Sequence, residues 1–83
     1  MTWSHTEIRQ ARCTPLGPVV RRLGYELAVG SEGNRIIVGL STEIVIKDHY
    51  WVCTEDGVGG NAIDFLMSIE GMNFAQAMRL LRS

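Results

Sequence analysis

The stretch with the most distinctive spacing is a glycine run, Gly57-Val58-Gly59-Gly60-Asn61, which directly precedes an apolar segment. Backbone N–H groups at the start of a helix attract anions, so such a run can cradle a phosphate. The Lys-Ser/Thr pair of a P-loop is missing here, and 83 residues leave no room for the βαβ unit of a dinucleotide site. The run therefore predicts a strand-to-helix corner, where glycines supply positive φ angles and close backbone packing.

Four side chains of metal-binding type are present: His5, Cys13, His49 and Cys53. His49 and Cys53 lie at the end of a predicted strand pair, but the spacing from His5 to Cys13 is not usual for zinc ligands. The alternative interpretation places one histidine on the surface and the other in a turn, with both thiols buried or idle. The nine acidic residues are scattered, and no nucleophile with a partner base stands out. We therefore expect no metal, no cofactor and no enzymatic activity.

Cations and aromatic side chains are the residues that bind single-stranded DNA, through its phosphates and its base faces. The sequence offers one group of these residues and an arginine pair that extends it: Arg35, Lys47, His49, Tyr50 and Trp51, with Arg21 and Arg22. The alternative is that the aromatic residues belong to the core and that the arginine pair is a solvated helix face. Because the net charge is −1, we expect weak and salt-sensitive DNA binding at best.

The elements that position these residues follow from apolar periodicity and turn signals. The predicted elements before the glycine run are helices over 5–13 and 16–23, a turn over 30–34, a strand over 35–40 and two strands within 43–54. In the last strand Tyr50 and Val52 share one face, and Trp51 and Cys53 share the other. The pattern alone does not decide which of these faces is buried.

Two capped helices are expected after the glycine run. Asn61 is a suitable N-cap with Asp64 at the third helical position, and Asn73 and Gln76 repeat this arrangement. The first of the two helices is expected to end at Gly71. The candidate core residues are Ile36, Val38, Ile44, Ile46, Trp51, Ile63, Phe65, Leu66 and Phe74. The fold class is α+β, a small antiparallel β-sheet flanked by short N-terminal helices and two C-terminal helices, in one domain over 1–83.

The segment VCTEDGVGGNAIDFLMSIEGMNFAQAMRLL resembles the second half of the zinc-binding domain of bacterial DNA primases. That family has Cys-x-x-Cys, then Gly-x-Gly-Gly-Asp/Asn-Ala-Ile-x-Phe, then a Phe-x-x-Ala segment. The matching residues are Gly57, Gly59, Gly60, Asn61, Ala62, Ile63, Phe65, Phe74 and Ala77. Upstream, PLGPVVRRLGYEL and GNRIIVGL resemble the family's first helix and the strand before its first ligand pair, so the resemblance covers most of residues 8–81.

The zinc ligands of that family are mostly missing. The family holds zinc with a Cys/His pair before a hairpin and a Cys-x-x-Cys after it. Here Cys53 stands at the first position of the second pair and Asp56 at the second, while GLSTEI, residues 39–44, contains neither Cys nor His. A carboxylate beside thiolates is a poor zinc ligand. The resemblance therefore implies a zinc-ribbon-like fold without zinc, similar to primase-like domains of mobile elements and plasmids.

The resemblance implies a non-catalytic accessory domain in DNA replication or priming, which binds single-stranded DNA template weakly. The alternative is a docking module that tethers a polymerase, primase or helicase of a mobile element, through residues such as Met72, Met78 or Leu80. DNA binding predicts a contiguous Arg/Lys patch around the sheet, whereas docking predicts an exposed apolar patch. No apolar run has membrane-span length, no signal-peptide core is present and cysteines are few, so we expect a cytoplasmic protein without membrane contact.

Overall fold

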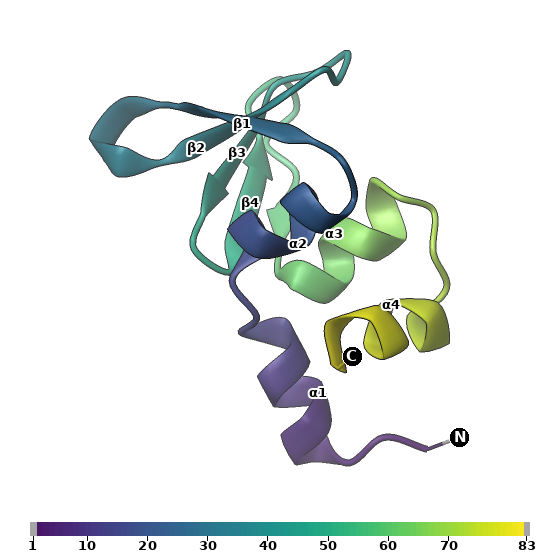
Figure 1. Cartoon of the computed structure of the whole chain (residues 1–83). Helices are drawn as coiled ribbons and strands as arrows, with labels where there is room; N and C mark the ends of the chain where they lie inside the picture. The colour runs from purple at the N-terminus through teal and green to yellow at the C-terminus, as the bar shows by residue number, and fades with distance from the viewer. Residues whose placement is uncertain (1, 83) are drawn as a thin grey trace.

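The chain forms a five-stranded antiparallel sheet that packs against helices on one of its two faces (Figure 1). The computed structural model describes residues 2–82, apart from the side chain of Ser31. In chain order the elements are α1 (His5–Arg12), α2 (Leu16–Arg22), β1 (Glu26–Val29), the 3-10 helix η1 (Ser31–Gly33), β2 (Arg35–Val38), β3 (Ile44–Lys47), β4 (Tyr50–Cys53), β5 (Gly59–Gly60), α3 (Ala62–Ser68) and α4 (Phe74–Arg82). The expected α+β class is confirmed.

The strands follow one another in the sheet in chain order, from β1 to β5, as a meander. The hairpin of β3 and β4 turns through Asp48 and His49, and Asp48 has a positive φ of 56°. Two strands were missed by the sequence analysis. β1 has the weakly patterned sequence ELAV, and β5 consists of two glycines that become a strand only by pairing with Trp51 and Val52.

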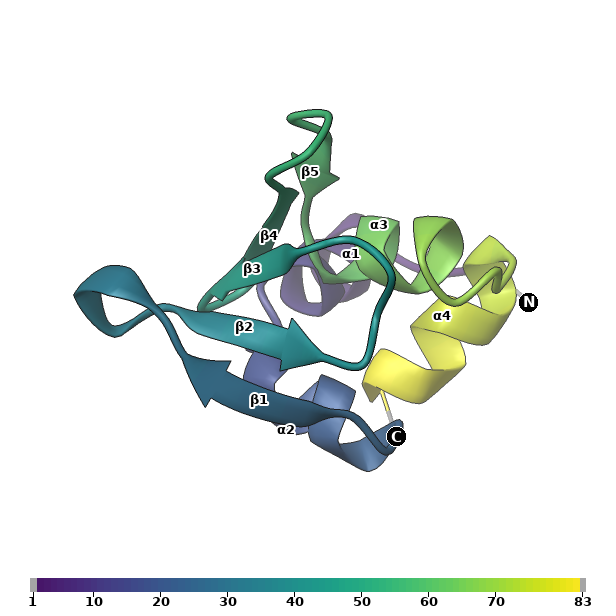
Figure 2. The same cartoon turned by 90° about the horizontal axis from the view of Figure 1, so that it is seen from above.

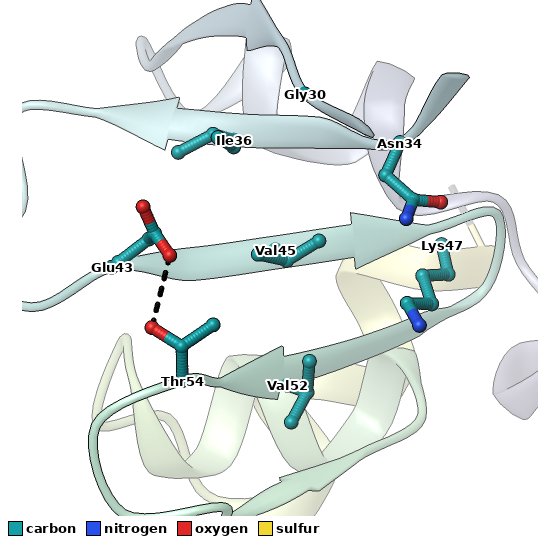
Figure 3. Close-up of a pocket in the computed structure, with 8 residues that line it drawn as sticks. All are labelled: Gly30, Asn34, Ile36, Glu43, Val45, Lys47, Val52 and Thr54. Carbon is teal, nitrogen blue, oxygen red and sulfur yellow. Dashed lines mark hydrogen bonds between the residues drawn. The ribbon is translucent and has the colours of Figure 1, made fainter. Parts of the chain in front are cut away.

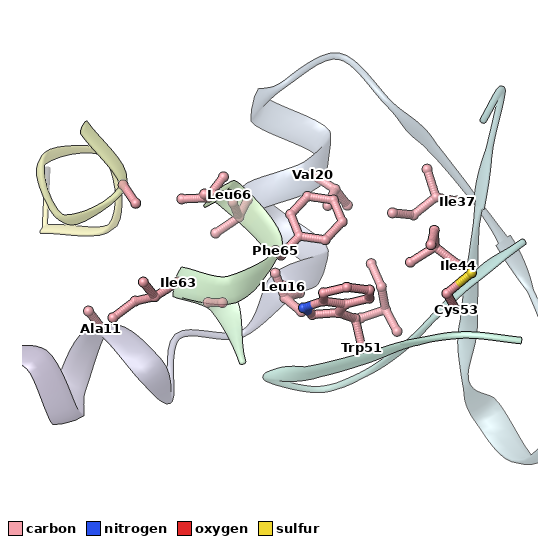
Figure 4. Packing of buried hydrophobic residues seen from close by; sticks show 14 of the residues in the cluster. Ala11, Leu16, Val20, Ile37, Ile44, Trp51, Cys53, Ile63, Phe65 and Leu66 are labelled. Atoms are coloured by element: carbon pink, nitrogen blue, oxygen red, sulfur yellow. The ribbon is translucent and has the colours of Figure 1, made fainter. Parts of the chain in front are cut away.

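The core lies between the sheet and the helices, as Figure 4 shows. Trp51 from β4 and Phe65 from α3 meet edge to face, with ring centroids 6.0 Å apart and an interplanar angle of 80°. The strands also contribute Ile37, Ile44 and Ile46 to this layer. The helices complete it with Ala11, Leu16, Val19, Val20, Ala62, Ile63, Leu66, Ala77 and Met78. Because most of these side chains are large and apolar, hydrophobic burial is the main force that holds the helices on the sheet.

Both C-terminal helices begin with the predicted caps. The Asn61 side chain accepts a hydrogen bond from the Asp64 N–H, and the Asp64 carboxylate accepts one from the Asn61 N–H, each at 3.1 Å. Asn73 and Gln76 make the same reciprocal pair, at 2.8 and 2.9 Å. The α3 helix ends at Ser68, earlier than predicted, and Gly71 follows with a φ of 71°.

Three of the candidate core residues are placed differently from the prediction. Ile36 and Val38 lie on the sheet face that points away from the helices, and Val38 is 46% exposed. Phe74 is 38% exposed at the start of α4. The β-branched sequence of β2 is apolar on both faces, so alternation could not show which residues point to the core.

Candidate functional site

The sheet face turned away from the helices, here called the open face, carries a row of apolar residues. Ala28, Ile36, Val45 and Val52 pair successively across β1, β2, β3 and β4, and Val52 pairs with Gly59 on β5. The helices pack on the opposite face, whose side chains form the core, and within residues 2–82 no residue of this row belongs to that core; Figure 2 shows the sheet and the helices from above. A continuous apolar row on an open sheet face is the kind of surface that another molecule buries.

The central part of the row forms a shallow groove of about 340 Å³ (Figure 3). Val45 forms its floor, with Ile36 and Val52 on the neighbouring strands to either side. Glu43 and Lys47 line it as well, one at each end of β3, and the Glu43 carboxylate accepts a hydrogen bond from the Thr54 hydroxyl at 3.0 Å. The groove therefore has an apolar middle and ends of opposite charge.

Formal charge is divided unevenly between the segment that forms the sheet and the rest of the chain. Residues 26–60, which contain the whole sheet, carry six acidic side chains against Arg35 and Lys47, a net charge of −4. The remaining residues carry +3, and their six arginines all lie on α1, α2 and α4: Arg9, Arg12, Arg21, Arg22, Arg79 and Arg82. Because phosphates are anionic, the sheet is the less favourable side of this molecule for DNA.

The predicted DNA-binding residues do not form one patch. Lys47 and Tyr50 pair on the open face, and Tyr50 is 46% exposed. Arg35 pairs with Ile46 on the helix-bearing face and donates from Nη1 to the Gly33 carbonyl at 3.1 Å. His49 lies in the hairpin turn, where its Nδ1 is 3.1 Å from an Asp48 carboxylate oxygen. Arg21 and Arg22 are exposed on α2.

Trp51 requires a correction. It is 1% exposed, and its indole N–H donates to the backbone carbonyl of Asn61 at 3.0 Å. The residue is therefore a core residue and offers no stacking surface for a base. The alternation of the strand placed Tyr50 and Trp51 on opposite faces, but it did not show that the helices cover the Trp51 side.

The glycine run makes the predicted corner between β4 and α3. A Cβ atom on Gly59 would lie less than 3.0 Å from the backbone carbonyl oxygen of Trp51. A Cβ atom on Gly60 would be equally close to the Asp64 carboxylate, which the α3 cap holds in place. Gly57 has a φ of 76°, which L side chains rarely adopt. Close packing and backbone conformation thus explain the glycines without a bound phosphate.

The positions that match the family's second zinc pair form a small turn held by hydrogen bonds. The Cys53 N–H donates to the Val58 carbonyl at 2.6 Å, and the Val58 N–H donates to the Asp56 carboxylate at 3.0 Å. The pKa of Asp56 lies below its ordinary value because the Val58 N–H and then the Cys53 thiol donate to its carboxylate. In the described part of the chain no three His, Cys, Asp or Glu side chains gather as metal ligands, so His5, Cys13, His49 and Cys53 do not come together.

A second hollow, which sequence reasoning missed, lies among α1, α3 and α4. It has a volume of about 400 Å³, and its lining includes Arg12, Met67 and the partly exposed Phe74. The residues come from three segments far apart in the chain, so no local pattern indicated them. Met78, which we expected at a docking surface, is fully buried, whereas Met72 and Leu80 line another hollow with Gln76 and Arg79.

The comparisons with known proteins give no family for this chain: no family model matches it, and no curated protein matches it. The functional argument therefore depends on the residues and their arrangement. Among the helices of residues 2–82, none is long and apolar enough to cross a membrane.

Proposed function

We propose that this chain is a non-catalytic docking domain that binds a protein partner with the open face of its sheet. The observation that carries the proposal is the apolar row Ala28–Ile36–Val45–Val52, which runs across four strands and has no helix over it in the described chain. Because no helix of the described chain covers the side chains of this row, a partner that buries them gains hydrophobic free energy.

The cellular setting of the proposal comes from the resemblance to primase zinc-binding domains. Several residues that carry it, Gly59, Gly60 and Asn61 among them, form the corner and the cap that join β4 to α3. We propose a primase-like domain without zinc that works in the cytoplasm in DNA replication or priming. Its partner is a polymerase, primase or helicase of a mobile element, which it tethers.

The test is NMR spectroscopy of the backbone amides of the labelled protein, mixed in turn with a purified polymerase, primase and helicase of a mobile element. We expect line broadening at Ile36, Val45 and Val52, and loss of the interaction in the Val45→Lys variant. Arg79→Glu on α4 is the matched control, because it also changes the charge of one side chain but lies away from the sheet. Broadening that is insensitive to Val45→Lys would contradict the assignment of the open face.

Weak binding of single-stranded DNA is the second candidate function, and one observation favours it. The hollow among α1, α3 and α4 places the exposed ring of Phe74 together with Arg12, a stacking surface beside a cation, although the carboxylate residue Asp64 also lines it. This site differs from the predicted one on the β3–β4 hairpin. Titration of wild type and variants with a short oligothymidine, at low and moderate salt, distinguishes the helical hollow from the β3–β4 hairpin as the binding site. Loss of binding in Phe74→Ala places DNA on the helices, and loss in Tyr50→Ala places it on the sheet.

A further inference from the structure

We propose that the open face receives one amphipathic helix of its partner, and that this helix carries basic side chains at one end. The inference deepens the docking proposal above and depends on it, because it names the kind of segment that the face binds. It follows from the backbone chemistry of the face, from its dimensions and from the placement of its charges.

The backbone chemistry favours a helix over an extended peptide. The β3 strand, which runs through the groove, is paired on both sides, with β2 and with β4. An extended peptide laid across such a face finds no backbone partners there, and buried N–H and C=O groups without partners are costly. A helix satisfies its own backbone groups internally and presents only side chains to the row.

The dimensions of the groove fit a helix as well. Glu43 and Lys47 are four residues apart along an extended strand, which corresponds to about 13 Å, or roughly nine helical residues. The strands that hold Ile36 and Val52 lie on either side of β3, about 10 Å from each other, close to the diameter of a helix with its side chains. Val45 stands halfway between Glu43 and Lys47 on the same face, beneath the centre of such a helix.

The charges set the composition of the helix. Glu43 lies at one end of the groove. The Thr54 N–H donates to the Glu43 backbone carbonyl at 3.2 Å. The exposed Glu55 and Asp56 come directly after Thr54 in the chain, so this end of the groove is acidic. Lys47 lies at the other end. Basic side chains are therefore favoured over the Glu43 end. A second copy of this chain fits less well, because two sheet regions of net charge −4 repel each other.

The test uses the whole chain as bait for a phage-displayed library of 14-residue peptides. The library has a fixed apolar stripe at helical spacing and free residues at all charged positions. We expect enrichment of Lys and Arg at one end of the peptide and a gain of helicity on binding. Val45→Lys should weaken the selected peptides at least tenfold, and Glu43→Lys about fivefold, with Arg79→Glu unchanged. Thermal melting of each variant verifies its fold, and Glu43 is exposed, so its substitution tests the inference without altering the core.

The double variant Glu43→Lys/Lys47→Glu gives the sharpest result, because it exchanges the two ends and should select peptides of the reversed charge order. Selected peptides that depend on Val45 but lack a basic end, or that bind without becoming helical, would overturn the inference and leave the docking face intact. A selection that yields no Val45-dependent peptide would contradict the docking face itself.

Discussion

The indole N–H of Trp51 donates to the backbone carbonyl of Asn61, ten residues further along the chain and 3.0 Å away. The same carbonyl accepts the hydrogen bond from the Phe65 N–H, also at 3.0 Å, which opens the first turn of α3. One buried ring thus links the β4 strand to the start of the helix that follows the glycine corner. This link explains why the largest aromatic side chain of the hairpin is turned inward.

Replacement of Trp51 by Phe should lower the free energy of unfolding by about 2 kcal/mol, since it removes the hydrogen bond to Asn61 and part of the buried ring. Urea denaturation followed by circular dichroism measures the change. Tyr50→Phe, on the open side of the same strand, is the control and should change stability by less than about 0.5 kcal/mol. Equal effects of the two substitutions would contradict the inward position of Trp51.

Replacement of Gly59 by Ala should destabilise the protein by more than about 2 kcal/mol, because the new Cβ would overlap the Trp51 carbonyl oxygen. Gly17→Ala is the matched control. Its Cβ would lie 3.9 Å from the nearest Leu27 carbon, at a helical position, so alanine should stabilise α2 by about 0.5 kcal/mol. The two melting temperatures should shift in opposite directions, and a rise for Gly59→Ala would show that the corner can relax.

Tyr25 makes stability sensitive to alkaline pH. Its hydroxyl donates to the Glu70 carboxylate at 2.6 Å, and this bond raises the pKa of Tyr25. A raised pKa in the folded state gives a stabilisation that is complete below the unfolded pKa of about 10 and is lost as the pH rises through the folded value. Tyr25→Phe should lower stability at pH 7 by about 1 kcal/mol and remove this alkaline loss. Unfolding curves between pH 8 and pH 11 test both expectations.

Asp56 makes stability sensitive to acid, with the opposite sign. Because the Val58 N–H and the Cys53 thiol lower its pKa, its stabilisation is present above the unfolded pKa of about 3.9 and is lost as the pH falls through the folded value. Asp56→Ala should reduce stability more at pH 7 than at pH 2.5. Glu55→Ala at the adjacent exposed position is the control. A larger effect of Asp56→Ala in acid than at neutral pH would reverse the assigned role of the carboxylate.

Metal should be irrelevant to folding. The thermal midpoint of the purified protein should be the same with a chelator, without additions and with a small excess of Zn²⁺. Removal of a structural zinc usually unfolds a domain of this size, so the comparison discriminates clearly. A midpoint that falls in chelator and is restored by Zn²⁺ would contradict the proposal of a primase-like domain without zinc.

Much of the fold could be predicted from local signals. The pairs Asn61 with Asp64 and Asn73 with Gln76 predict the starts of both C-terminal helices, and the observed cap hydrogen bonds confirm these starts. The functional surfaces could not be predicted in the same way, because they depend on which sheet face the helices cover. Ile36 and Ile37 are chemically alike, yet Ile37 is buried in the core and Ile36 lines the open groove. The second hollow joins α1 to α4, and such a long-range contact leaves no periodic pattern.

The uneven division of charge gives the molecule an electric dipole. The arginines of α1, α2 and α4 form its positive side, and the sheet region with its acidic turns forms its negative side. In the field of a polyanion such a molecule experiences a torque before any contact is made. Such a torque would turn the helices toward the phosphates and the apolar row of the sheet outward into the solvent. Orientation near a nucleic acid would then leave the row accessible, even where net attraction is weak.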